Sequence, residues 1–239
     1  MLPLAQSELV QLVRNRAVLV TSLLMPVAAS IFFIGYRDVF ARIGSLGYVA
    51  AVLVFTIAAF TLYATTVTTL AGRRQELFLK RLRSTAATDT AILSGLVLPV
   101  TAIAAVQVAL ILVVFGAVGG TPAEPLLLVV AVVATFVMML ALGVATAGVT
   151  TSPEHAQVTT LPLSLGVIAV ASWVGITGTE DLALLKRLLP GGAATELVVV
   201  AWNGGLALAD ALLLLAPTVA WVVVAVALAA RMFRWEPRR

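Results

Sequence analysis

The sequence predicts an all-helical protein that crosses a membrane several times, and two observations carry this prediction. Of the 239 residues, 62% are hydrophobic and only 11% are charged, whereas a soluble domain is about half apolar and about a quarter charged. The apolar residues also stand in continuous runs of about 18 to 26 residues, the length that a helix needs to cross about 30 Å of hydrocarbon. Strands of a membrane barrel would instead alternate apolar and polar residues. We therefore expect one transmembrane domain over residues 1–239.

Residues 1–16 precede the first long apolar run and predict an amphipathic helix in the membrane interface. Leu9 and Leu12 lie on one face at helical spacing, while Glu8 and Arg14 lie on the opposite face. Such a helix lies in the plane of the interface rather than across the membrane. A solvated tail is the alternative. Because five further apolar runs follow, we expect the first run to be an uncleaved span and not a signal peptide.

Six transmembrane helices are predicted from the apolar runs. The second run has 26 residues, which is longer than a span needs, so we expect it to tilt or to project beyond the bilayer. The first and third runs contain Pro26 and Pro99, and Pro26 predicts a kink. The fifth run is short, and Pro162 predicts a broken span there. A short polar loop around Arg37 and Asp38 should join the first two spans. The predicted spans cover about 17–36, 46–71, 91–116, 126–150, 159–176 and 209–230.

Residues 178–208, between the last two predicted spans, contain two apolar stretches that are too short to cross a membrane. These stretches are 182–189 and 193–202, and a Pro-Gly-Gly sequence at 190–192 divides them. The pattern predicts two short helices that enter the outer leaflet and return. Such an external re-entrant segment is tolerated where surrounding protein buries its backbone. An amphipathic loop on the outer surface is the alternative.

The distribution of basic residues predicts the orientation of the chain. With six spans, eleven of the fifteen lysines and arginines fall on the side of both termini, and only four fall on the opposite side. Because cytoplasmic segments carry the excess of lysine and arginine, both termini are expected in the cytoplasm. The basic residues cluster beside apolar runs, so we expect no nucleic-acid partner despite the net charge of +4. The high content of Ala, Val and Leu favours a bacterial protein, and hence the inner (cell) membrane.

The polar side chains inside the predicted spans are mainly hydroxyls. Thr61, Thr65, Thr68 and Thr69 form one stripe along the second predicted span. The stripe either makes hydrogen bonds across a helix interface, each contributing about 0.6–2 kcal/mol, or lines a path for an amphiphilic substrate. Gln107 in the third predicted span allows the same two interpretations. All five residues are therefore candidates for a substrate path.

Several kinds of chemistry are absent from the sequence. No ionisable residue lies near the middle of a predicted span, which argues against a pump driven by protons or other ions. The chain has no glycine-rich phosphate-binding loop followed by lysine, so we expect ATP to be bound elsewhere. The single histidine, His155, has only Glu154 beside it, and metal sites usually need several converging ligands. We therefore expect no catalytic residue, metal or cofactor on this chain.

The charged segment 73–83 lies between the second and third predicted spans and holds five of the fifteen basic residues. Within it, Glu76 and Lys80 stand four residues apart, in the order that favours an ion pair on a helix. The segment predicts a short cytoplasmic helix with one apolar and one basic side, which suits docking to a partner. The apolar residues that can share one face are Phe78, Leu79 and Leu82.

The order of residues in RRQELFLKRLRSTAAT, directly after the second predicted span, resembles the first cytoplasmic loop of the type 2 ATP-binding-cassette (ABC) export permeases. Leu77 stands where glycine is usual in that family, Phe78 where threonine is usual, and Ala86 where proline is usual. The layout also resembles the family over the whole chain, with an interfacial helix, six spans and a broken external segment before the last span. The matching residues of the loop are Arg74, Glu76, Leu79, Arg81, Leu82 and Thr85.

The resemblance implies a complete transport mechanism. Two permeases would pair in the membrane, as a homodimer or with a related chain, above two nucleotide-binding ATPase subunits. The ATPase subunits would hold ATP and Mg²⁺, and their closure would move the permeases so that a hydrophobic or amphiphilic substrate leaves outward. Drugs, lipids and lipid-linked products are substrates of this kind. The residues implied in coupling to the ATPase are Arg74, Glu76, Leu79, Lys80, Arg81, Leu82 and Arg83.

Two other functions are compatible with the composition. A secondary transporter would be driven by an ion gradient and would need a site for the coupling ion. An assembly factor or a membrane-embedded enzyme would not transport, and no catalytic constellation in the sequence favours an enzyme. The charged residues after the second span could also serve only to orient the chain and to contact lipid headgroups. These residues are Glu76, Lys80, Arg81 and Arg83.

Overall fold

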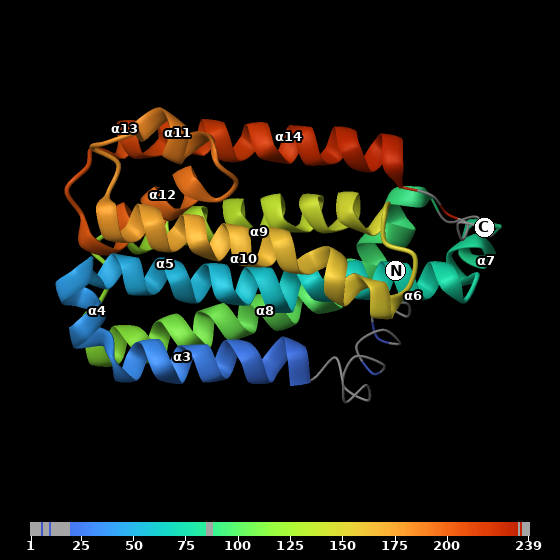
Figure 1. The fold of residues 1–239 in the computed structure, drawn as a ribbon, viewed down its shortest axis with the longest axis horizontal. Helices are drawn as coiled ribbons and strands as arrows, with labels where there is room; N and C mark the ends of the chain where they lie inside the picture. Colours follow the sequence, from blue (N-terminus) through green and yellow to red (C-terminus); the bar gives the residue numbers. More distant parts are fainter. Residues whose placement is uncertain (1–5, 7–9, 11–19, 85–87, 234, 236–239) are drawn as a thin grey trace.

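The computed structural model describes residues 6, 10, 20–84, 88–233 and 235. All regular secondary structure in these residues is helical, and the long helices lie side by side in one bundle (Figure 1). The all-helical prediction is therefore confirmed for this part of the chain. The interfacial helix predicted over residues 1–16 lies outside the described residues, apart from Gln6 and Val10, and so do Thr85 and Ala86.

Among the described residues, five continuous helical stretches are long and apolar enough to cross a membrane, which agrees with the prediction of a protein with several spans. A sixth span is counted only if two helices joined by a sharp bend near the start of the chain are taken as one. The five stretches are Leu46–Gln75, Asp89–Gly119, Pro125–Ala147, Pro153–Thr177 and Ala209–Met232.

A π-helical turn and two α-helices lie between residues 20 and 43. The π-helix η1 (Val20–Leu24) leads into α3 (Met25–Gly35), and α4 (Arg37–Ile43) follows. Pro26 is the second residue of α3, which continues directly from η1. The axis bends by 74° between α3 and α4. The short polar loop predicted after the first span is therefore wrong, because these residues form the helix α4.

The second stretch occupies the centre of the bundle. It is built from α5 (Leu46–Ile57), the π-helix η2 (Ala58–Ala64) and α6 (Thr65–Gln75). Ser45 starts α5, because its hydroxyl accepts a hydrogen bond from the Tyr48 amide at 3.1 Å. All residues of α5 after Leu46 are buried, and α8, α9, α10 and α12 pack against this stretch. The stretch ends four residues later than predicted, so the helix includes the first charged residues of the segment 73–83.

The next three helices are α8 (Asp89–Gly119), α9 (Pro125–Ala147) and α10 (Pro153–Thr177). Two of them are longer than the sequence suggests, and α9 ends three residues before its predicted end at residue 150. The short, broken fifth span was a wrong prediction, because α10 has 25 residues and continues through Pro162. A proline removes one N–H group from a helix, and neighbouring helices can satisfy the carbonyl that it leaves. For the same reason α8 continues through Pro99.

Four helices follow α10 in the part of the chain that the structure describes. The short helices α11 (Ala183–Leu188) and α12 (Gly192–Asn203) lie within the segment 178–208, and α13 (Leu208–Leu213) leads into α14 (Leu215–Met232). Helix α12 packs against α5, α9 and α10, and most of its residues are buried. In Figure 1 it lies among the long helices at one end of the bundle.

The bundle has two ends with different short elements (Figure 1). At one end, the α7 end, the chain turns from α6 through α7 (Phe78–Arg83) into α8, and α14 finishes on the same side. At the other end, the α12 end, lie α4, α11, α12 and α13. Candidate functional residues lie at both ends and in the middle between them.

Candidate functional site

The segment 73–83 is divided at the α7 end, and it does not form the continuous helix that the sequence predicts. Helix α6 ends at Gln75, and α7 begins at Phe78. Between them Leu77 has a left-handed backbone with φ of 58°. This conformation costs a residue with a side chain about 1–2 kcal/mol, and glycine adopts it freely. The resemblance places a glycine at this position, so the turn has the geometry that a glycine would favour.

Helix α7 has a buried apolar side and an exposed basic side. Leu79 is fully buried, and Leu82 is half-buried against the core. Lys80 and Arg81 are exposed. The buried leucines fix α7 on the bundle, and the guanidinium of Arg81 lies 6.0 Å from the centre of the Phe78 ring. We call the exposed side, with Lys80, Arg81 and Glu76, the α7 surface.

Arg74 differs from the other charged residues among the predicted coupling residues because it is buried. Only 1% of its surface is exposed, and its guanidinium donates a hydrogen bond to the carbonyl oxygen of Thr150. Thr150 follows the end of α9, where helix carbonyls lack partners within the helix. Arg74 therefore fastens the end of α6 to the connection between α9 and α10, and it does not belong to the α7 surface.

Ion pairs and ring contacts hold the remaining cations close to α7. Arg73 lies 3.1 Å from the carboxylate of Glu76 and 5.3 Å from the centre of the Phe78 ring. Arg83 lies 3.2 Å from the carboxylate of Asp89, and its guanidinium stacks 5.1 Å from the ring centre of Trp235. The pair of Arg83 with Asp89 is exposed on both sides, and pairs of this kind add little stability. The ion pairs and ring contacts do set the position of each charge. The contact between Arg83 and Trp235 also connects α7 with the segment after α14.

Replacing Leu77 by glycine is expected to stabilise the protein by about 0.5–1 kcal/mol, because the strain of the left-handed backbone disappears while the unfolded chain gains some freedom. Little packing is lost, since Leu77 is 46% exposed. Equilibrium unfolding in detergent measures the change. The matched control is Lys80→Gly, an exposed site inside α7, which should lose about 1 kcal/mol. A loss of stability in Leu77→Gly would contradict the assignment of strain to this turn.

The predicted threonine stripe does not act as one unit. Thr68 donates its hydroxyl hydrogen to the carbonyl of Ala64 at 2.9 Å, and Thr65 donates to the carbonyl of Phe60 at 3.3 Å. Both bonds stay within the second stretch, as expected for hydroxyls that pack inside a bundle. Thr69 is half-buried.

Thr61 is the member of the stripe that reaches other helices. Its hydroxyl oxygen lies 2.7 Å from the side-chain oxygen of Gln107 in α8 and 2.6 Å from the backbone carbonyl of Ser22 in η1. The structure thus brings together two of the predicted substrate-path residues that are 46 positions apart in the sequence. An apolar hollow of about 400 Å³ lies elsewhere, between α9 and α14, and none of the predicted substrate-path residues lines it.

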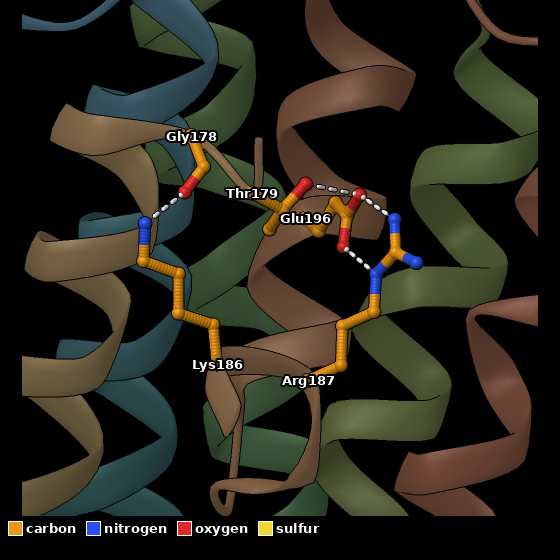
Figure 2. Close-up of polar contacts among 5 residues, drawn as sticks. All are labelled: Gly178, Thr179, Lys186, Arg187 and Glu196. Carbon is orange, nitrogen blue, oxygen red and sulfur yellow. Dashed lines mark hydrogen bonds and ion pairs between the residues drawn. The ribbon is translucent and has the colours of Figure 1, made fainter. Parts of the chain in front are cut away.

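A second group of polar contacts lies at the α12 end (Figure 2). Lys186 in α11 is 2% exposed, and its ammonium donates to the carbonyl of Gly178 at 2.7 Å and to the hydroxyl of Thr177 at 2.8 Å. It also lies 5.3 Å from the ring centre of Trp173. These acceptors stand at the end of α10, where the helix dipole favours a cation. Lys186 therefore ties α11 to the end of α10.

The next residue in the sequence ties α11 to a different helix. Arg187 donates from Nε and Nη2 to the two carboxylate oxygens of Glu196 in α12, at 2.7 and 2.6 Å, and Thr179 donates to the same carboxylate at 2.7 Å. The hydrogen bond with Glu196 raises the pKa of the Arg187 guanidinium above its ordinary value. Two parallel bonds of this kind fix orientation as well as distance.

The far end of α12 is held by the loops around it. Asn203 donates to the hydroxyl of Ser45 at 2.9 Å and accepts from the amide of Gly47 at 3.1 Å. The amides of Ala123 and Glu124 donate to the last carbonyls of α12 at 3.0 and 2.9 Å. Helix α12 is thus fixed at both ends. We call α11, α12 and the segment 178–182 before them the α12 cap.

Sequence reasoning missed the α12 cap as a site, although a signal was present. A lysine and an arginine stand side by side in an otherwise apolar stretch, and Glu196 follows nine residues after the arginine. Charges in such a stretch need partners. No cluster of three or more His, Cys, Asp or Glu side chains that could hold a metal occurs in the described part of the chain.

Comparison with known proteins adds no relative. No protein-family model matches the chain, and no curated protein matches it. Function must therefore be argued from the α7 surface, the buried contact of Thr61 with Gln107, and the α12 cap.

Proposed function

We propose that this chain is the membrane permease subunit of an ATP-driven exporter, which moves a hydrophobic or amphiphilic molecule outward when a separate ATPase subunit is bound. The partners are a nucleotide-binding ATPase, which holds ATP and Mg²⁺, and a second permease, either a copy of this chain or a related one. The chain resides in a bacterial inner membrane with both termini in the cytoplasm. The chain itself catalyses no reaction.

The observation that carries this proposal is the construction of α7. A helix of six residues, separated from α6 by the turn at Leu77, buries Leu79 in the bundle and exposes Lys80 and Arg81. A short element with its apolar side fixed and its charged side exposed can receive a partner and pass displacement to the helices beneath it. Its basic charge favours a partner with an acidic docking surface.

Two contacts connect the α7 surface with the centre of the bundle. Helix α6 is one continuous stretch with η2 and α5, which pack against most other long helices. The buried Arg74 joins the end of α6 to the connection between α9 and α10. A displacement of α7 would therefore reach α5, α9 and α10 as rigid elements. This arrangement supports transport driven from the α7 end more than transport driven by an ion bound within the spans.

The experiment uses the double variant Lys80→Ala, Arg81→Ala. The chain is purified from membranes with its ATPase subunit, reconstituted, and assayed for ATPase activity stimulated by the permease. We expect stimulation at a fixed ATPase concentration to fall on the order of tenfold, which corresponds to about 1.4 kcal/mol of lost binding. Unfolding of the permease should change by less than about 0.5 kcal/mol, because both side chains are exposed.

The matched control is the double variant Arg37→Ala, Arg42→Ala, which removes the same charge from α4 at the opposite end of the bundle. It should leave stimulation unchanged. Equal stimulation in the α7 variant and the wild type would count against the proposal. Transport by the chain alone, lost with the proton gradient and indifferent to ATP, would favour a secondary transporter instead.

A further inference from the structure

Two π-helical turns from distant parts of the chain face each other in the bundle. The η1 turn (Val20–Leu24) contacts the η2 turn (Ala58–Ala64). Turns of this kind are rare and occur frequently at functional sites, because the wider helix rearranges the local hydrogen bonds. Here the contact between them is polar, since the hydroxyl of Thr61 in η2 donates to the carbonyl of Ser22 in η1.

The hydrogen bonds of Gln107 are incomplete at this contact. Its side-chain NH₂ group is buried and has no hydrogen-bond partner among the described residues. Its side-chain oxygen lies 2.7 Å from the Thr61 hydroxyl, but that hydroxyl carries one hydrogen and lies closer to the Ser22 carbonyl. In this orientation the Gln107 amide has a spare donor and an acceptor that competes for a single hydrogen; in the flipped orientation, the amide would donate to Thr61 and leave its oxygen spare. A buried amide left in this state is costly.

The chemical group that would complete the hydrogen bonds of the Gln107 side chain is one that both donates and accepts a hydrogen bond. A hydroxyl does this with a single oxygen. No Asp, Glu, Lys or Arg lies in residues 43–72 or 90–123, which include this part of the second stretch and of α8. A charged group would be poorly stabilised there. The complementary group is therefore an uncharged hydroxyl.

The position of Ser22, Thr61 and Gln107 would let a molecule with such a hydroxyl enter from the lipid. Thr61 lies halfway along the stretch Leu46–Gln75. Leu24, two residues after Ser22, and Val106, which precedes Gln107, are 58% and 67% exposed. The polar side chains of Ser22, Thr61 and Gln107 are thus buried, while apolar side chains close to them in sequence are exposed. A molecule dissolved among lipid chains would reach them by separating η1 from α8.

We propose that Ser22, Thr61 and Gln107 form a binding site for the hydroxyl group of a long-chain, uncharged amphiphile. This inference rests on the proposed function in one respect, that the bound molecule is the exported cargo. The binding itself needs neither ATP nor a partner. The hydroxyl would donate to the Gln107 oxygen and accept from its NH₂ group, while Thr61 keeps its bond to the Ser22 carbonyl. The rest of the molecule would remain among apolar side chains.

The test uses photoreactive probes on the full chain in phosphatidylcholine nanodiscs. One probe is 1-dodecanol with a diazirine in its chain, and the other is the same chain without the hydroxyl. After illumination, mass spectrometry locates the labelled residues. We expect the alcohol to label the segments around Ser22, Thr61 or Gln107 about fivefold more than the alkane, the ratio for one hydrogen bond inside a membrane. Unlabelled 1-dodecanol should compete, and dodecane should not.

Variants then show which side chains cause the stronger labelling by the alcohol. Gln107→Leu and Thr61→Val keep the side-chain volume and should reduce the alcohol labelling to the level of the alkane. The matched control is Thr68→Val, whose hydroxyl bonds only the backbone of its own helix and which should keep the preference. Equal labelling by both probes would overturn the proposal, and so would an alcohol preference that survives Gln107→Leu. If a variant fails to fold, competition by unlabelled 1-dodecanol and dodecane on the wild-type protein still tests whether the hydroxyl is recognised. The α7 surface takes no part in this experiment, so its result is independent of coupling to an ATPase.

Discussion

Replacing Gly192 by alanine is expected to lower the free energy of unfolding by about 3 kcal/mol, at the upper end of the usual cost of overpacking. A Cβ atom at Gly192 would overlap the carbonyl oxygen of Lys186 and would lie 2.8 Å from its carbonyl carbon. Both obstacles are backbone atoms, so no side chain can rotate to make room. Helix α11 would have to move away from α12, and the bonds of Lys186 and Arg187 would lengthen or break.

The matched control is Gly166→Ala in the interior of α10, where a Cβ atom would meet nothing within 4 Å. This variant should gain about 0.4–1 kcal/mol, because alanine restricts the unfolded chain and favours a helix. Equilibrium unfolding in detergent measures both variants. A Gly192→Ala protein as stable as the wild type would mean that α11 can shift freely, and the α12 cap would then not be rigid.

The Arg74→Ala variant should be less stable than the wild type by about 3 kcal/mol. The substitution removes a charge-assisted hydrogen bond to the Thr150 carbonyl and the packing of a fully buried side chain. The neighbouring Arg73→Ala serves as the control, because that guanidinium pairs with the exposed Glu76 and should contribute less than about 1 kcal/mol. Similar small losses in both variants would contradict the structural role assigned to Arg74.

The Arg74 result also distinguishes a loss of coupling caused by lower stability from a loss of coupling caused by weaker contact with the partner. If Arg74→Ala lowers coupling, it should do so together with stability, because the end of α6 is no longer fixed to the connection between α9 and α10. The Lys80 and Arg81 variants should lower coupling at unchanged stability. The coupling residues implied by the resemblance would then divide into two groups, one that positions the α7 surface and one that touches the partner.

Much of the fold could be predicted because a long apolar run has few alternatives in a membrane. The runs that became α8, α9 and α10 were recognised from length alone. Their ends were less predictable, since Thr88 and Ser152 act as helix caps outside the apolar runs. The helix α4 was missed because seven residues of which three are charged are equally typical of a loop.

The candidate sites could be predicted only in part. Local sequence patterns do not indicate which side chains are buried or which residues of different helices contact one another. The charge of Arg74 suggested an exposed residue, but its carbonyl partner at Thr150 lies 76 positions away. Thr61 and Gln107 were both selected as polar residues within spans, and nothing in the sequence paired them. The polar contacts of Lys186 depend on the end of α10, whose position required the three-dimensional structure.

The adjacent cations of α11 restrict how the length of this region can vary. Neighbouring residues on a helix point about 100° apart, so Lys186 reaches α10 while Arg187 reaches α12. Inserting or deleting one residue in α11 would rotate one cation into the place of the other and leave a buried charge without its acceptors. The connection 204–207, by contrast, is mostly exposed and can absorb such changes. Homologous chains should therefore keep a constant spacing from Thr177 to Glu196 and vary in length after Asn203.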